Sequence, residues 1–147
     1  MSRKLYLGID PGKNGGIGFV TESKQWSFNL KEMTDKDIFD ALKEVTEHDY
    51  TGIFCYIERV SSSPQMGNVS AFTFGAGFGA LKMALVATGI AFDQVSPQKW
   101  QWEMKCRSGG DKKVTKRRAQ ELFPDLKITH ANADALLIAE FCRRNYA

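Results

Sequence analysis

Residues 53–57 form an uninterrupted apolar run, Ile-Phe-Cys-Tyr-Ile, which ends abruptly at Glu58. A strand with one face in water alternates apolar and polar side chains, whereas a continuous run is typical of a strand covered on both faces. Helices usually provide that cover, so the run predicts a layered α/β fold with this segment inside its sheet.

The first thirty residues have the short period and frequent turns of an antiparallel meander. Strands are predicted over residues 4–9, 16–21 and 25–30. Asp10-Pro11-Gly12 separates the first two strands, because proline and glycine together mark a turn. A short polar turn around residues 22–24 separates the second and third.

After residue 34 the apolar residues recur every three or four positions, which indicates helices. Ile38, Leu42 and Val45 predict an amphipathic helix over 34–47 with Thr34 as its N-cap. The remaining predicted elements are a helix at 69–88, a short strand at 91–95, a helical turn after Pro97, and helices at 111–123 and 131–145. We therefore expect one α/β domain, residues 1–147, with a mixed central sheet of about five strands flanked by helices.

The segment 69–88 is unusual for a helix because it contains Gly75, Gly77 and Gly79. Each glycine costs about 1 kcal/mol relative to alanine in a helix interior. We expect close packing against a second helix to compensate, within the chain or across a dimer. Lys82 and several hydroxyl residues interrupt the segment, so we expect no membrane span.

The cysteines and the N-terminus indicate a reduced, intracellular protein. Cys55, Cys106 and Cys142 are odd in number and lack C-x-x-C spacing, which argues against a disulfide framework and against structural zinc. The N-terminal residues show no signal-peptide pattern. Cys55 and Cys142 lie in apolar runs and are predicted to be core residues.

Three acidic residues stand out because each lies at the end of, or within, an apolar segment. Asp10 ends the first strand, Glu58 ends the 53–57 run, and Asp134 lies in the first turn of a helix that is apolar nearly all round. If the two strands are neighbours, Asp10 and Glu58 end side by side with no evident basic partner. Carboxylate oxygens are the ligands that Mg²⁺ prefers, and two such ions can promote phosphodiester hydrolysis.

Each acid also has a simple structural interpretation, which the sequence leaves open. Asp10 could initiate the turn at Pro11-Gly12. Glu58 could pair with Arg59 or a distant lysine. Asp134 could stabilise the positive end of its helix.

Five pieces of the sequence, in this order and spacing, resemble the RuvC family of Holliday junction resolvases, and most closely its phage-type members. The resemblance extends from Leu7 to Arg144, and the pieces are LGIDPG at 7–12, IERV at 57–60, SPQKW at 96–100, DKK at 111–113 and ADALLIAEF at 133–141. It implies a ribonuclease H-like fold and a homodimer that cuts four-way DNA junctions. It further implies an Mg²⁺-dependent endodeoxyribonuclease, with Mn²⁺ as substitute and two ions per site, in the cytoplasm of a bacterial cell or phage-infected host.

The resemblance also implies roles for individual residues. Asp10, Glu58 and Asp134 match the catalytic metal ligands of the family pattern. A further acid usually precedes the last aspartate by three or four positions, where this chain has Ala131 and His130. His130 is a candidate metal ligand in its place, or else only a residue at the helix start, and Asn132 is a candidate helix cap.

Basic residues gather between positions 105 and 118. Those predicted to contact DNA phosphates are Lys105, Arg107, Lys112, Lys113, Lys116 and Arg117. The resemblance places a lysine of the DKK piece near the scissile phosphate, and we favour Lys113 over Lys112 for that role. The formal net charge of +3 does not by itself indicate a nucleic-acid partner, and the alternative is a solvated helix face.

Two other functions remain open at this point. The missing acid near Ala131 is compatible with a catalytically weakened junction-binding module of the same fold. A related nuclease acting on RNA is the other alternative. Phe72 and Phe74 are expected to be core or dimer residues in preference to residues that stack on bases.

Overall fold

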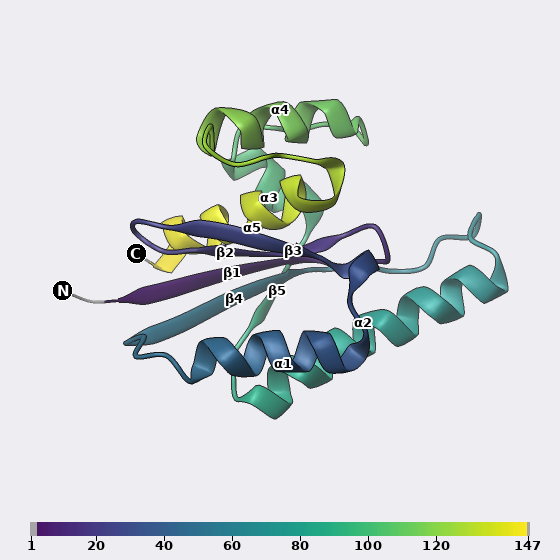
Figure 1. Ribbon diagram of the computed structural model, residues 1–147. Helices are drawn as coiled ribbons and strands as arrows, with labels where there is room; N and C mark the ends of the chain where they lie inside the picture. Colours follow the sequence, from purple (N-terminus) through teal and green to yellow (C-terminus); the bar gives the residue numbers. More distant parts are fainter. Residues whose placement is uncertain (1–2, 147) are drawn as a thin grey trace.

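The computed structural model describes residues 3–146 and shows a five-stranded sheet between two layers of helices (Figure 1). The strands lie in the order β3-β2-β1-β4-β5. Strand β2 is antiparallel to its neighbours β1 and β3, whereas β4 and β5 run parallel to β1. The predicted mixed sheet is therefore confirmed. The strands are β1 (Lys4–Asp10), β2 (Gly16–Val20), β3 (Gln25–Asn29), β4 (Gly52–Glu58) and β5 (Asp93–Val95).

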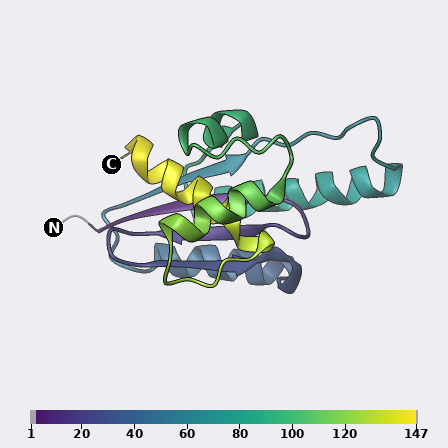
Figure 2. The ribbon, with the colours of Figure 1, turned by 90° about the horizontal axis from the view of Figure 1, so that it is seen from above.

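The helices divide between the two faces of the sheet. Those on one face are α1 (Asp35–Thr46) and α2 (Asn68–Thr88), preceded by the 3-10 turn η1 (Leu30–Glu32). Those on the other face are α3 (Pro97–Glu103), α4 (Lys112–Leu122) and α5 (His130–Tyr146), with α4 outermost, as the view from above shows (Figure 2). Thr34 is the N-cap of α1 as predicted, in a reciprocal capping box with Asp37.

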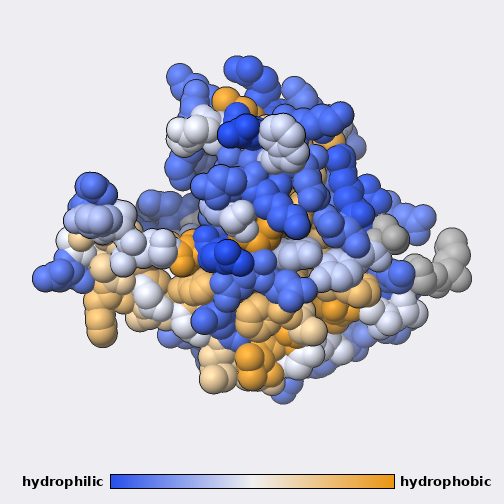
Figure 3. Space-filling model, turned by 180° about the vertical axis from the view of Figure 1, so that it is seen from behind, coloured by the Kyte–Doolittle hydropathy of each residue, from blue (hydrophilic) through white to orange (hydrophobic). Residues whose placement is uncertain are grey.

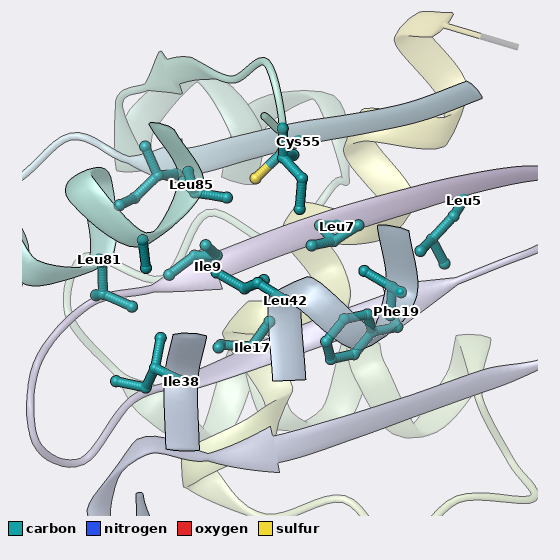
Figure 4. Packing of buried hydrophobic residues seen from close by; sticks show 14 of the residues in the cluster. Leu5, Leu7, Ile9, Ile17, Phe19, Ile38, Leu42, Cys55, Leu81 and Leu85 are labelled. Carbon is teal, nitrogen blue, oxygen red and sulfur yellow. The ribbon is translucent and has the colours of Figure 1, made fainter. Parts of the chain in front are cut away.

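An aliphatic core joins the sheet to α1 and α2 (Figure 4). Leu7 and Ile9 of β1 point from the sheet toward Leu42 of α1 and Leu85 of α2, and all four side chains are fully buried. Strand β4 was expected to be buried on both faces, but its buried residues lie only on the face toward α1 and α2. Cys55 and Ile57 are buried in this core, but the alternate residues of β4 are only half-buried under α5.

Glycines in β1 and β2 allow the backbone of α5 to rest directly on the sheet. A Cβ atom on Gly8 would lie 2.2 Å from the backbone nitrogen of Ala139, and one on Gly18 would lie 2.6 Å from the carbonyl oxygen of Ala135. Any larger residue would push the helix away. This close approach fixes α5, and with it Asp134, against the strands that carry the other two acids.

Helix α2 has no close helical partner at its glycines within the described chain, so of the two expected arrangements only packing across a dimer is left to test. A Cβ atom on Gly75, Gly77 or Gly79 would meet nothing within 4 Å in the described part of the chain, so no helix of the same chain packs closely on these glycines. By length and composition α2 could also cross a membrane, contrary to the sequence argument. However, Leu81 and Leu85 belong to the core, which makes the C-terminal half of α2 part of the domain.

Candidate active site and nucleic-acid surface

The carboxyl ends of β1 and β4 bring Asp10 and Glu58 to one edge of the sheet. The two strands are parallel neighbours in which Ile9 pairs with Ile57, so the next residue of each strand is one of the two acids. Asp134 reaches the same edge from α5. From the sequence we expected Asp134 in the first turn of this helix. The helix begins at His130, so Asp134 lies in its second turn.

The pKa of each of the three carboxyls is raised, chiefly by burial. Burial raises the pKa of Asp10 well above its usual value, and the charges of Glu58 and Asp134 raise it further. Burial also raises the pKa of Glu58 and of Asp134. Among residues 3–146 none of the three takes part in an ion pair. The site thus concentrates negative charge that the described side chains do not neutralise by contact.

One cation and one hydroxyl partly offset this charge. Lys112, the first residue of α4, lowers the pKa of all three carboxyls by its charge. The buried Thr115 of the same helix lowers the pKa of Asp134 through a hydrogen bond. The lysine whose charge acts on all three carboxyls is therefore Lys112, whereas the sequence argument favoured Lys113. The positive charge of His130 also lowers the pKa of Asp134, so His130 lies within electrostatic reach of the site.

The donor set suits a hard divalent cation in its chemistry, because carboxylate oxygens that lack a cationic partner are the ligands such ions prefer. As the side chains stand, no three acidic, histidine or cysteine residues of the described chain converge closely enough to form a ligand group. Asp10, Glu58 and Asp134 thus share a site electrostatically without forming a closed cage.

The start of α5 corrects the predicted role of Asn132. Asn132 is the third residue of the helix and not its N-cap. Its side-chain oxygen accepts a hydrogen bond from the backbone N–H of Thr129 at 2.8 Å, and its amide donates to the carbonyl of Lys127 at 3.0 Å. Asn132 therefore fixes the start of the helix from within, while His130 remains exposed beside it.

The predicted basic surface lies on α4 and the segment before it. None of the six predicted DNA-binding residues forms an ion pair with another described residue, so their charges are free for phosphates. Arg118 differs, because it donates to the carbonyl of Met104 at 2.8 Å and pairs with Glu121. The guanidinium of Arg107 lies 5.4 Å from the ring centroid of the exposed Trp102. The upper layer of the molecule is correspondingly hydrophilic (Figure 3).

Sequence reasoning missed two residues that touch the acids. The indole nitrogen of Trp100 donates to Oε2 of Glu58 at 2.7 Å, although Trp100 lies 42 positions away. Thr115 reaches Asp134 from α4. The SPQKW piece contained a possible signal, because a tryptophan buried in a helix needs an acceptor for its N–H group.

Comparisons with known proteins support the fold. No family model and no curated protein matches the sequence. Among solved structures, a Thermus thermophilus RuvC structure has a TM-score of 0.63 at 20% identity, and covers 96% of this chain and 96% of that chain. The T. thermophilus RuvC in complex with Holliday junction substrate has a TM-score of 0.62 at 20% identity, and covers 97% of this chain and 96% of that one.

The chain has a ribonuclease H-like fold. This confirms the fold that the sequence resemblance implied. At 20% identity the likeness is one of fold, so activity, partners and the roles of individual residues rest on the site itself.

Proposed function

We propose that this protein is a structure-specific endonuclease that cuts four-way DNA junctions by metal-dependent hydrolysis. The observation that carries the proposal is the meeting of Asp10, Glu58 and Asp134 at one edge of the sheet, without an ion-pair partner in the described chain. The unpaired cations of α4 beside them provide contacts for DNA phosphates. The junction-bound structural neighbour supports the choice of substrate.

In this proposal Asp10, Glu58 and Asp134 hold Mg²⁺ or Mn²⁺, two ions per site, with His130 as a candidate fourth ligand. When bound, the ions supply an activated water and stabilise charge on the phosphate oxygens. In this hydrolysis the oxygen of one water would bond to phosphorus as the bond to the 3′ oxygen breaks, and the proton that the water gives up to solvent would be balanced by one that the 3′ oxygen takes from solvent. The products carry 5′-phosphate and 3′-hydroxyl ends. The cytoplasm of a bacterial cell or phage-infected host is the proposed location.

The experiment that tests the proposal compares cleavage of a four-way DNA junction with cleavage of linear duplex DNA, single-stranded DNA and structured RNA in Mg²⁺ or Mn²⁺. We expect cleavage of the junction at least about 100-fold faster than that of linear duplex, because contacts to two arms add binding energy. Junction binding without cutting would favour a catalytically weakened binding module. Faster cutting of RNA would favour an RNA-processing nuclease.

The phage-type assignment has no support from the solved neighbours, both of which are T. thermophilus RuvC. The assignment rests on the five sequence pieces alone. The proposed activity does not depend on that assignment.

Substitution of Lys112 is expected to slow cleavage more than substitution of Lys113. Lys112→Met should lower the single-turnover rate by about 10- to 100-fold, because the site loses the cation whose charge acts on the three carboxyls and would offset charge developing on the scissile phosphate. Lys113→Met is the matched control and should mainly weaken DNA binding. Single-turnover kinetics at saturating protein measure both variants. A larger rate loss for Lys113→Met would instead identify Lys113 as the lysine near the scissile phosphate, as the sequence argument favoured.

A homodimer formed through α2 is the proposed assembly. Six exposed residues of α2 follow one another at intervals of three and four positions, namely Val69, Phe72, Ala76, Gly79, Met83 and Val86. Such a heptad stripe is typical of a helix that packs along a partner helix. Small residues at its centre allow two backbones to approach closely, and Lys82 is the one charged residue of the helix. Figure 3 shows apolar side chains along the lower side of the molecule, where α2 lies.

The assembly can be tested with a charged residue on the stripe. Phe72 is 80% exposed, so Phe72→Asp should leave the fold intact but weaken dimerisation at least about 100-fold, because it would bury a charge at the interface. Thr73→Asp, exposed but off the stripe, should remain dimeric. Light scattering coupled to size-exclusion chromatography measures the mass. A monomeric wild type that binds phosphatidylcholine vesicles would instead favour a membrane contact for α2.

A further inference from the structure

The hydrogen bond between Trp100 and Glu58 comes from a compact local arrangement. Val95 of β5 pairs with Glu58 in the sheet, and its carbonyl accepts from the backbone N–H of Arg59 at 2.7 Å. The chain then turns at Ser96, the N-cap of α3, and Pro97, its first residue. Trp100 is the fourth residue of α3. One turn of helix therefore brings its indole back to Glu58, which lies beside the strand that precedes α3.

Trp100 is held rigidly, which makes it suited to orient another side chain. The indole is fully buried. It belongs to a hydrophobic cluster on the other face of the sheet, which joins residues of α3, α4 and α5. The carbonyl of Trp100 accepts from the backbone N–H of Met104, and the carbonyl of Met104 accepts from Arg118 of α4. The helix that carries Lys112 is thus linked to the residue that holds Glu58.

The chemistry of the donor matters as much as its position. An indole N–H is neutral and can only donate, and it is used here for one carboxylate oxygen, Oε2. A lysine or arginine in its place would neutralise the carboxylate and compete with a cation for it. Trp100 instead fixes the rotamer of Glu58, preserves its negative charge and leaves the other oxygen free.

We propose that Trp100 is a positioning residue, which holds the Glu58 carboxylate so that its second oxygen is available to a divalent cation shared with Asp10 and Asp134. The inference rests on the proposed function, since it assigns Trp100 a role toward the metal of that site. Trp100 also fills core space, so a useful test must separate the N–H group from the bulk of the ring.

The test compares Trp100→Phe with Trp102→Phe, a matched loss of an indole on the same helix. Trp102 is 66% exposed and its ring lies against Arg107. Titration calorimetry of the DNA-free protein with Mn²⁺ measures metal affinity, and thermal unfolding without metal measures stability. We expect Trp100→Phe to bind Mn²⁺ about 10- to 100-fold more weakly, as is typical when a hydrogen-bond partner of a metal ligand is lost. Trp102→Phe should bind Mn²⁺ as the wild type does.

Raising the Mn²⁺ concentration should restore most of the junction cutting lost in Trp100→Phe, because a positioning defect weakens binding of the metal without removing a ligand. If this variant does not fold, Trp100 can be replaced by benzothienylalanine, which removes only the N–H group. Trp26→Phe and Trp102→Phe in the same chain leave Trp100 as the one tryptophan to be replaced. Unchanged Mn²⁺ affinity in the Trp100 variant, with a wild type that binds Mn²⁺ and cuts, would overturn this inference alone. A wild type that neither binds Mn²⁺ nor cuts would overturn the proposed function and the inference with it.

Discussion

Asp10→Asn is expected to abolish cleavage of a four-way junction while leaving junction binding nearly unchanged. Asp10 ends β1 beside the end of β4, and burial together with the charges of Glu58 and Asp134 raises the pKa of its carboxyl. Replacing one oxygen by an NH₂ group removes an oxygen that we propose binds the metal, and it keeps the size of the side chain. We expect a rate loss of at least about 1000-fold, equivalent to about 4 kcal/mol of transition-state stabilisation. Binding is expected to persist because we propose that the α4 cations, and not Asp10, contact the phosphates.

The matched control is Asp125→Asn, an exposed acid in the turn after α4. It should cut and bind like the wild type. Cleavage is measured on a labelled junction, and binding by gel shift in Ca²⁺ so that no turnover occurs. Loss of cutting and binding together in Asp10→Asn would mean that Asp10 is structural, and unchanged cutting would remove it from the active site.

Mn²⁺ is expected to stabilise the wild type against heat and to have little effect on Asp10→Asn. A ligand that binds only the folded protein adds about 2.7 kcal/mol at a concentration 100 times its Kd. In a domain of this size that corresponds to a rise in Tm of about 5–10 °C. Differential scanning calorimetry with and without Mn²⁺ measures the shift, with Asp125→Asn again as control. An equal shift in Asp10→Asn would place the bound metal elsewhere.

Without metal the same substitution should increase stability at neutral pH. The pKa of Asp10 in the folded protein is raised above its usual value of 3.8, so the folded state binds protons more readily than the unfolded state. Ionised Asp10 therefore destabilises the fold, and this cost is relieved as pH falls from above the raised pKa toward about 4. The Tm of Asp10→Asn should exceed that of the wild type near neutral pH, with a gap that narrows in acid. A wild type more stable than the variant at pH 7 would contradict this account of the site.

Most of the fold could be predicted because it follows from local periodicity. The antiparallel opening, the capped helix after Thr34 and the 53–57 strand all lie where their patterns indicate. The errors arose where the neighbours of a surface are decided by the rest of the fold. The exposed stripe of α2 has the composition of a buried helix, and a sequence does not show whether a second helix of the same chain covers it.

The candidate site likewise has a part that the sequence predicted and a part that it did not. The sequence by itself determined the three acids, since a carboxylate at the end of a buried strand or inside an apolar helix is costly unless something binds it. Only the tertiary structure decided what surrounds them. Trp100 and Lys112 reach the acids through α3 and α4, which lie far from β1 and β4 in sequence. Trp100 comes to Glu58 because β5 pairs with β4, and Asp134 comes to the same site because α5 rests on the glycines of β1 and β2. Both arrangements depend on long-range packing, which the local spacing of residues does not encode.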